Sequence, residues 1–239
     1  MLAESILQHN LDGVRGRIAA AERRAGRPAG SVRLLAVTKG HAAGQVLSGW
    51  RAGIREVGES YVQEASVKQA ACVATGLVWH FIGRPQRGNL KAIAQRFDWV
   101  HGLASVDHAL KLDQTRASCA AEPLNVCIQV NLSEEAQKNG VRQSELPGLI
   151  ERIRPLRHIR LRGLMTMSAG QDSAPARSAL FEHAAQLFSE LSPAAGDRWD
   201  TLSMGMSDDF EIAIAAGSTI VRVGTAIFGP RSNNLRNGS

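Results

Sequence analysis

The fold prediction starts from residues 32–57, VRLLAVTKGHAAGQVLSGWRAGIREV. The apolar, β-branched run at 32–38 predicts a strand, residues 42–52 have a helical pattern, and a second apolar run follows at 54–57. No hairpin signal separates the two strands. A strand, a helix and a further strand in this order predict a right-handed crossover between parallel strands.

The same unit recurs along the rest of the chain. Further apolar runs occur at 78–82, 99–103, 125–132, 159–167, 201–204 and 220–223, separated by helical patterns at 59–74, 88–97, 106–121, 142–154, 175–191 and 208–216. This α/β pattern, with eight strands in all, predicts a (β/α)8 TIM-type barrel. An open, doubly wound sheet is the alternative. It is disfavoured because the first strand is followed by Thr-Lys-Gly-His at 38–41 and by no Gly-rich dinucleotide loop.

The two ends of the chain are expected to add little to the barrel. Residues 1–26 predict an extra N-terminal helix, since apolar residues recur there at helical spacing, and they lack the basic and apolar regions of a signal peptide. We expect one domain over residues 1–230 and a polar, disordered tail over 231–239. No apolar run reaches 18 residues, which argues against a membrane span.

Composition narrows the class of protein. The 239 residues have a net charge of +6, but basic residues are scattered, so nucleic acid is not an expected partner. The dense basic stretch at 152–162 is interpreted as a solvated helix end and strand entry, with an RNA-binding face as the alternative. The three cysteines form no metal-binding spacing and favour a reducing cytoplasm, with no metal site.

Lys39 is the first candidate for chemistry. The chain has only five lysines against 23 arginines, so plain positive charge is supplied by arginine. A lysine amine can lose its proton and an arginine cannot, so a lysine at the end of an apolar strand is a candidate nucleophile. The alternative is an ordinary loop lysine, or one that pairs with a carboxylate.

A phosphate site is predicted beside Lys39. Barrels place their sites at the C-terminal ends of the strands and often bind phosphate after strands 7 and 8. The last two strand ends supply hydroxyl groups and glycines, at Ser203, Gly205, Gly224 and Thr225. A short helix beginning after Gly224 would direct amide groups at an anion.

Barrel closure places Arg222 beside Lys39, because the eighth strand pairs with the first. A cation nearby favours the neutral amine of a lysine and hence a Schiff base with an aldehyde. A phosphate site, a Schiff-base lysine and an arginine together predict pyridoxal 5′-phosphate (PLP) as the cofactor. An arginine facing the pyridine nitrogen would keep it unprotonated and make the ring a weak electron sink. A salt bridge at the barrel rim is the alternative role for Arg222.

With these residues assembled, the chain resembles the pyridoxal phosphate homeostasis proteins, which are similar to the N-terminal barrel of alanine racemase. The resemblance covers roughly residues 5–230. Its motifs are LLAVTK (34–39), GESYVQE (58–64), WHFIG (79–83), FDWVHGL (97–103), NVCIQVNLSEEAQKNG (125–140), LRGLMTM (161–167), LSMGMSDDFEIAIAAGST (202–219) and VRVGTAIFG (221–229).

The resemblance implies a role for each matching residue. Lys39 would carry the Schiff base, and Arg222 would face the pyridine nitrogen. The phosphate would be held by Ser203, Gly224 and Thr225, with help from the backbone of Met204, Gly205 and Met206. His80 would face the barrel mouth, with a structural role inside its strand as the alternative.

The sequence departs from the family pattern at two places. Ser60 stands where the family has Asn, which puts a cofactor contact from this position in doubt. The loop at 84–89 lacks the family's Asn-Lys pair, whose lysine could be supplied by Lys91. The Lys138-Asn139-Gly140 segment is intact and is interpreted as a βα-loop turn, with a loop near the mouth as the alternative.

Three functions compete. The first is a cytoplasmic PLP carrier in PLP homeostasis, without robust catalysis, monomeric, and with PLP-dependent apo-enzymes as recipients. The second is a low-activity amino acid racemase or lyase with Lys39 and either His80 or Tyr61 as bases. The third is a class I aldolase or another phosphosugar barrel. The carrier is favoured because the racemase's second domain, with its catalytic Tyr, has no counterpart in this sequence.

Overall fold

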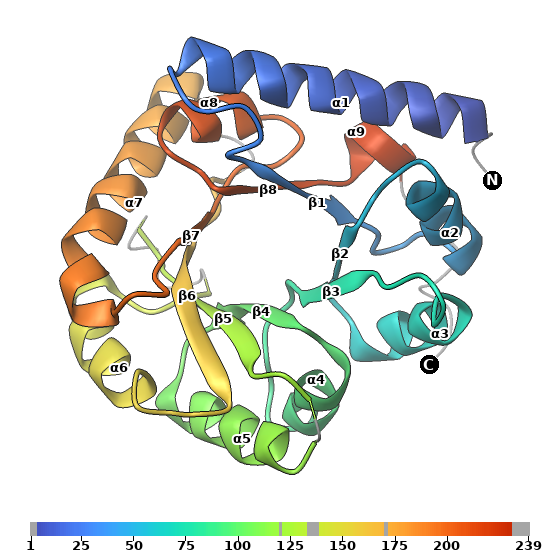
Figure 1. Cartoon of the computed structure of the whole chain (residues 1–239). Coiled ribbons are helices and arrows are strands. Elements are labelled where there is room, and N and C mark those ends of the chain that lie inside the picture. Colours follow the sequence, from blue (N-terminus) through green and yellow to red (C-terminus); the bar gives the residue numbers. More distant parts are fainter. Residues whose placement is uncertain (1–3, 120, 133–138, 170–171, 231–239) are drawn as a thin grey trace.

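The computed structural model describes residues 4–119, 121–132, 139–169 and 172–230 (Figure 1). Its strands are β1 Arg33–Val37, β2 Glu56–Glu59, β3 Val78–Phe81, β4 Trp99–Leu103, β5 Leu124–Gln129, β6 Ile159–Met165, β7 Thr201–Ser203 and β8 Ile220–Val223. Its helices are α1 Glu4–Arg24, α2 Ala43–Arg51, α3 Val62–Ala71, α4 Leu90–Arg96, α5 Val106–Ala117, α6 Leu146–Ile153, α7 Ala174–Ala195, α8 Phe210–Ala215 and α9 Thr225–Phe228, with a 3-10 turn, η1, at Gln143–Glu145.

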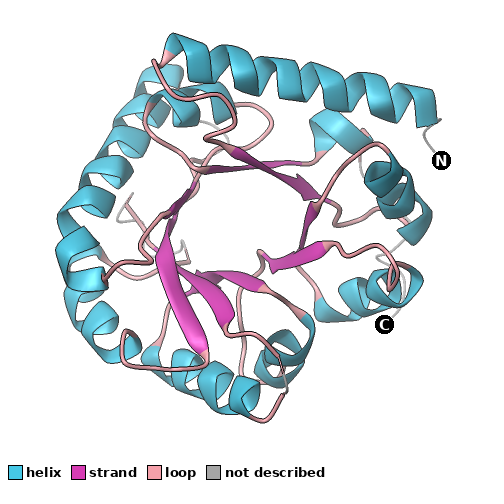
Figure 2. Ribbon diagram, in the orientation of Figure 1, coloured by secondary structure: helices cyan, strands magenta, loops and turns pink. Residues whose placement is uncertain are grey.

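The strands close into a parallel barrel in chain order, β1 to β8, with helices around the outside (Figure 2). This confirms the predicted (β/α)8 barrel and its extra N-terminal helix. β8 pairs with β1 over four residues, from Arg33 opposite Ile220 to Ala36 opposite Val223. The register brings the chain beyond β1, which holds Lys39, next to the chain beyond β8.

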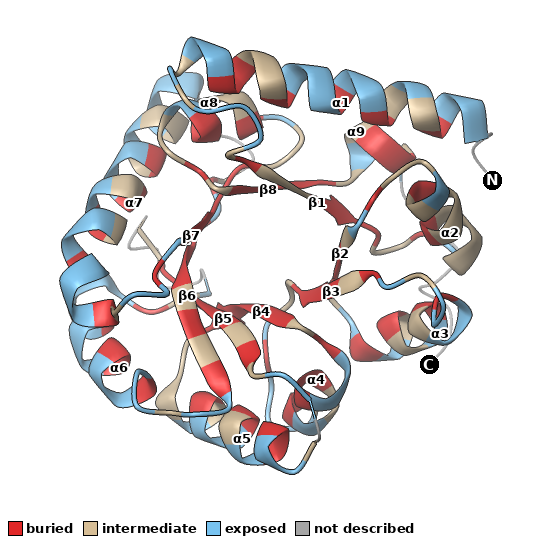
Figure 3. Ribbon diagram, viewed as in Figure 1, coloured by how far each residue is buried: buried red, intermediate tan, exposed pale blue. Residues whose placement is uncertain are grey.

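The core has two parts. Outward-facing strand side chains pack against the inner faces of the helices and form one apolar cluster (Figure 3). Inside the barrel, Trp99, Cys127 and Met165 form a second, smaller cluster. The buried residues also include polar side chains from strands β3, β4, β7 and β8, namely His80, His101, Ser203 and Arg222. Polar groups in this position are costly unless they are hydrogen-bonded.

α1 lies outside the barrel, across α8 and α9 (Figure 1). Its buried apolar residues include Leu7, Leu11 and Val14. Glu22 is buried as well, and its carboxylate accepts hydrogen bonds from the amides of Gly30, at 3.1 Å, and Val32, at 2.8 Å. This carboxylate therefore ties the last turn of α1 to the start of β1.

Several predicted boundaries were too long. The strand predicted at 125–132 ends at Gln129, because Val130 leaves it to form an isolated bridge with Val141. The run at 159–167 ends as a strand at Met165. The predicted tail at 231–239 and Lys138 lie outside the described residues. No helix in the described part of the chain combines the length and the apolar character needed to cross a membrane.

Candidate functional site

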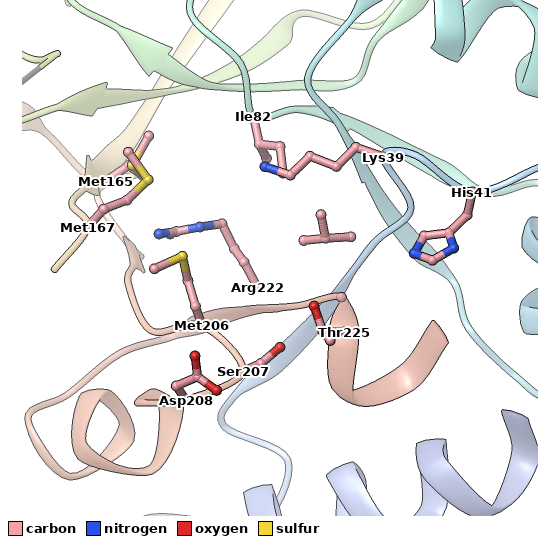
Figure 4. Close-up of a pocket in the computed structure, with 12 residues that line it drawn as sticks. Lys39, His41, Ile82, Met165, Met167, Met206, Ser207, Asp208, Arg222 and Thr225 are labelled. Carbon is pink, nitrogen blue, oxygen red and sulfur yellow. The ribbon is translucent and has the colours of Figure 1, made fainter. Parts of the chain in front are cut away.

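A pocket of about 230 Å³ opens at the C-terminal ends of the strands (Figure 4). Pockets for drug-sized ligands hold roughly 300–1,000 Å³, so this one suits a compact molecule. It lies where β1 and β8 meet, at the face where these barrels carry their sites. Its lining consists of Val37, Lys39, His41, Ile82, Met165, Met167, Met206, Ser207, Asp208, Arg222, Gly224 and Thr225.

Lys39 follows β1, and its side chain extends toward Ile82 along one side of the pocket (Figure 4). The backbone on both sides of it is held by charged side chains, one of them buried and the other partly buried. The Nζ of Lys68 donates to the carbonyl of Thr38 at 2.7 Å, and the carboxylate of Glu64 accepts from the amide of Gly40 at 2.5 Å. The position of Lys39 is therefore set by its two neighbours in the chain.

Lys68, Glu59, Glu64 and Thr38 form a network that we call the lysine clamp. Lys68 Nζ lies 2.6 Å from a carboxylate oxygen of Glu59 and 2.6 Å from one of Glu64. The Thr38 hydroxyl donates to the same oxygen of Glu59. The side chains of Lys68 and Glu59 are 2% and 0% exposed, so both charges are out of water. Burial raises the pKa of Glu59, and the ammonium of Lys68 works against that rise.

Arg222 projects from β8 into the other side of the pocket (Figure 4). Its guanidinium donates to the hydroxyl oxygen of Ser203 at 2.7 Å and to the carbonyl of Thr166 at 2.9 Å. Both acceptors are neutral. Burial lowers the pKa of Arg222 to about 10, which still leaves the group charged at neutral pH. The pocket thus contains a fixed cation that can donate hydrogen bonds and cannot accept them.

The turn after β7 brings Met206 and Ser207 to the pocket. Gly205 has a φ of +93°, and a Cβ there would lie 2.6 Å from the Cβ of Ala213. The carboxylate of Asp209 accepts from the Met206 amide at 2.6 Å and from the Ser168 hydroxyl at 2.5 Å. Only glycine fits this close approach of the turn to α8.

The segment after β8 forms part of the pocket wall. Gly224 packs against β1, where a Cβ would lie 3.0 Å from the carbonyl oxygen of Val37. Thr225 begins α9, so the predicted short helix after Gly224 is present. The first amides of a helix have no acceptor within it. Figure 4 shows the Thr225 hydroxyl directed into the pocket.

Five of the ten predicted site residues line the pocket: Lys39, Met206, Arg222, Gly224 and Thr225. Met204 and Gly205 are buried behind it, where their backbone carbonyls accept from Ser218 and Arg222. Ser60 is half-buried and does not belong to the lining.

Two predicted site residues lie away from the pocket lining. His80 does not face the mouth: it is fully buried inside the barrel and is stacked on Trp99. Ser203 is also fully buried, and its hydroxyl lies between Arg222 and His101 instead of lining the pocket. Both side chains come from the residue layer below the mouth.

Sequence reasoning missed the clamp and part of the lining. Ser207 and Asp208 line the pocket directly after the predicted strand end, and His41 lies two residues after Lys39. The signal for the clamp was a Lys, the residue that this chain uses sparingly, nine residues after Glu59.

Comparisons with known proteins agree with this architecture. The alanine racemase N-terminal domain family matches residues 9–232. The chain is 43% identical to a pyridoxal phosphate homeostasis protein of Pseudomonas aeruginosa, over 95% of this chain and 96% of that protein. It is 42% identical to the Escherichia coli K12 protein of the same name, over 94% and 97% of the two chains.

A solved structure agrees in both fold and sequence. PipY of Synechococcus elongatus, a COG0325 family member determined with PLP bound, superimposes with a TM-score of 0.79 at 34% identity. The match covers 90% of this chain and all of PipY. The chain therefore belongs to the pyridoxal phosphate homeostasis proteins, a family built on the barrel of the alanine racemase N-terminal domain.

Proposed function

We propose that this protein binds PLP in the mouth pocket as a Schiff base on Lys39 and serves PLP homeostasis without robust catalysis. The observation that carries the proposal is the convergence of Lys39, Arg222 and Thr225 on one small pocket. The PLP-bound structure of PipY and the names of the curated relatives support the choice of ligand.

The pocket residues fit the chemical groups of PLP. When bound, PLP supplies an aldehyde that a lysine amine can engage and a ring that can withdraw electrons. The clamp holds the backbone at Lys39, so its side chain starts from a defined position. The hydroxyls of Thr225 and Ser207 and the backbone at Gly224 lie on one wall, where they can receive a phosphate.

Arg222 supports binding over turnover. We assign it to the ring nitrogen, which would have to accept a hydrogen bond because the guanidinium can only donate. A ring nitrogen that stays unprotonated is a poor electron sink. Of the two residues considered as a second base, His80 is buried below the pocket and Tyr61 is 65% exposed outside it. Neither side chain lines the place where a second base would act.

The protein as isolated provides the first test. We expect a visible absorption band that disappears on borohydride reduction, with the reduced adduct mapped to the peptide that contains Lys39. Lys39→Ala should abolish the band, and Lys91→Ala, an exposed lysine after the altered 84–89 loop, should keep it. A band that survives Lys39→Ala would overturn the assignment of the lysine.

Turnover is tested separately. Purified protein is incubated with single L-amino acids, and D-isomers and α-keto products are measured against free PLP. We expect no sustained excess over free PLP. An excess would replace the carrier with a low-activity racemase or lyase.

The remaining parts of the proposal concern the cell. We propose a cytoplasmic protein that acts as a monomer and passes PLP to apo-enzymes that depend on it. The PLP-loaded protein is mixed with such an apo-enzyme, and a Thr225→Val variant that carries the same amount of PLP is the comparison. The wild-type protein should restore the activity of the apo-enzyme faster than the variant does. Equal rates would argue against direct delivery.

A further inference from the structure

A chain of polar side chains crosses the barrel interior from the pocket to the opposite end. Ser203 Oγ lies 2.7 Å from a guanidinium nitrogen of Arg222 and 2.9 Å from Nδ1 of His101. Nε2 of His101 lies 2.9 Å from Nδ1 of His80. All four side chains are at most 5% exposed.

The chain continues to the N-terminal ends of the strands. Nε2 of His80 lies 3.2 Å from Oε2 of Glu56, within ion-pair distance, and both atoms are buried and make no hydrogen bond to any described residue. The second oxygen of Glu56 lies 3.5 Å from Arg33. Glu56 and Arg33 are the first residues of β2 and β1, while Arg222 is near the end of β8. The polar contacts therefore span the depth of the barrel.

The cation at one end of this chain and the carboxylate at the other favour one direction of the hydrogen bonds between them. Arg222 can only donate, so Ser203 accepts from it and has its own proton left to donate to Nδ1 of His101. His101 then carries its proton on Nε2 and donates to His80, which in turn carries its proton on Nε2, the atom that lies 3.2 Å from the carboxylate of Glu56. Burial lowers the pKa of both histidines, which agrees with two neutral rings.

We propose that His101, His80 and Glu56 are positioning residues that act through Ser203 to hold the Arg222 guanidinium in the pocket. Glu56 ends the chain with an acceptor that has no proton, and so it sets the direction of every bond above it. The effect on a ligand rests on the proposed function, because Arg222 is the group assigned to the PLP ring.

The interior of a barrel needs only side chains of the right volume. Barrel interiors are filled mainly by branched apolar residues, and this one uses Leu35, Trp99, Cys127 and Ile220 among others. Two imidazoles and a carboxylate cost desolvation there and stabilise the protein no better than apolar residues would. What they supply, and apolar side chains cannot, is a fixed acceptor for the Ser203 proton and, through Ser203, a fixed place for Arg222.

The first test needs no ligand. Nitrogen-15 spectra of the PLP-free protein should show the side chains of His80 and His101 neutral, both with the proton on Nε2. Glu56→Gln replaces the obligatory acceptor by an amide that can donate to His80. At least part of the population should then move the proton to Nδ1 on both rings. Glu122→Gln removes another carboxylate that pairs with an arginine, Arg160, and should change neither ring.

The second test asks whether Ser203 acts through Arg222 or on the phosphate. Ser203→Ala should weaken both PLP and pyridoxal, which has no phosphate, by the same factor, about tenfold for one hydrogen bond to a charged group. A loss confined to PLP would make Ser203 a phosphate ligand instead and would overturn this role. Circular dichroism of the variant checks that the barrel is folded.

The two proposals can fail separately. If the protein bound no PLP, the histidine protonation states would still test the chain. If PLP bound and either wild-type ring were charged or protonated on Nδ1, the chain would be wrong while the proposed function stood. Glu56→Gln spectra identical to those of Glu122→Gln would also overturn the inference.

Discussion

Replacing Lys68 by Met should destabilise the protein more than would be expected for a lysine in a helix, where lysines are usually exposed. The side chain is 2% exposed, and its ammonium contacts Glu59, Glu64 and the carbonyl of Thr38. Met keeps most of the volume and removes the charge. Glu59, 0% exposed, then keeps the Thr38 hydroxyl as its hydrogen-bond donor. Breaking a buried ion pair from one side costs about 3–5 kcal/mol.

The measurement is the free energy of unfolding from urea titrations, together with the melting temperature. For a domain of this size, each kcal/mol lowers the melting temperature by about 2–4 °C, so a loss of roughly 10 °C is expected. Lys111→Met is the matched control, because Lys111 is exposed and its ammonium bonds only to Gln114 among the residues that the structure describes. If the two variants were equally stable at neutral pH, the buried ion pair would not carry the energy assigned to it.

The pH dependence of stability provides a second measurement of the effect of Lys68→Met. Burial raises the pKa of Glu59 above its ordinary value of 4.5, so the folded protein holds this proton more tightly than the unfolded chain. The contribution of Glu59 to the free energy of unfolding is therefore complete below pH 4.5 and is lost as the pH rises through the raised pKa of Glu59. Lys68 limits this rise in the pKa of Glu59. Without Lys68 the pKa is higher, so stability continues to be lost up to a higher pH. The difference between Lys68→Met and the wild type should thus be smallest near pH 4.5 and grow toward neutral pH.

A double variant separates the charge from the packing. Glu59→Gln combined with Lys68→Met leaves no buried carboxylate at this position. It should recover part of the stability lost in Lys68→Met, and its stability should change less between pH 4.5 and 7. A double variant no more stable than Lys68→Met would locate the cost in packing instead.

Three further predictions concern other parts of the barrel. Gly163→Ala should lower the free energy of unfolding, measured in urea, by about 3 kcal/mol or more, because a Cβ there would overlap the β7 backbone and φ is +153°. The control is Gly148→Ala in α6, which has open space around it and should be neutral or stabilising. A thiol reagent at pH 8 should label the half-buried Cys119 in the folded protein and reach Cys127 only after unfolding, since burial raises the pKa of Cys127 to about 12. Thr225→Val should weaken PLP by about tenfold and leave pyridoxal binding unchanged, as expected for a lost hydrogen bond to phosphate.

Periodicity and barrel closure predicted the fold and the centre of the site. Each predicted apolar run overlaps one strand, because a parallel barrel repeats one local pattern eight times. Closure alone placed Lys39 next to Arg222, and both line the pocket. The family resemblance was confirmed by the comparisons. The Schiff base and the phosphate contacts stay predictions.

The depth of a side chain inside the barrel could not be predicted. Alternation along a strand tells which residues point inward, but the stagger of the strands decides which of them reach the mouth. His80 and Ile82 are two residues apart in one inward series, and only Ile82 lines the pocket. Ser203 lies outside the lining for the same reason, since it belongs to the layer below Arg222.

The lysine clamp was not predicted, because two of its residues have a sequence spacing that usually indicates a different arrangement. Glu64 and Lys68 are four residues apart on α3, a spacing that usually indicates an exposed pair on a helix surface. The residue that changes its meaning is Glu59, which comes from β2 and is fully buried. Only the packing of α3 on the barrel brings it to Lys68. The scarcity of lysine remains the usable signal: two of the five lysines lie at this site, one in the pocket and one directly behind it. The two basic residues of the pocket, Lys39 and Arg222, are thus both held from behind by polar groups, so we expect a pocket whose shape changes little when a ligand binds.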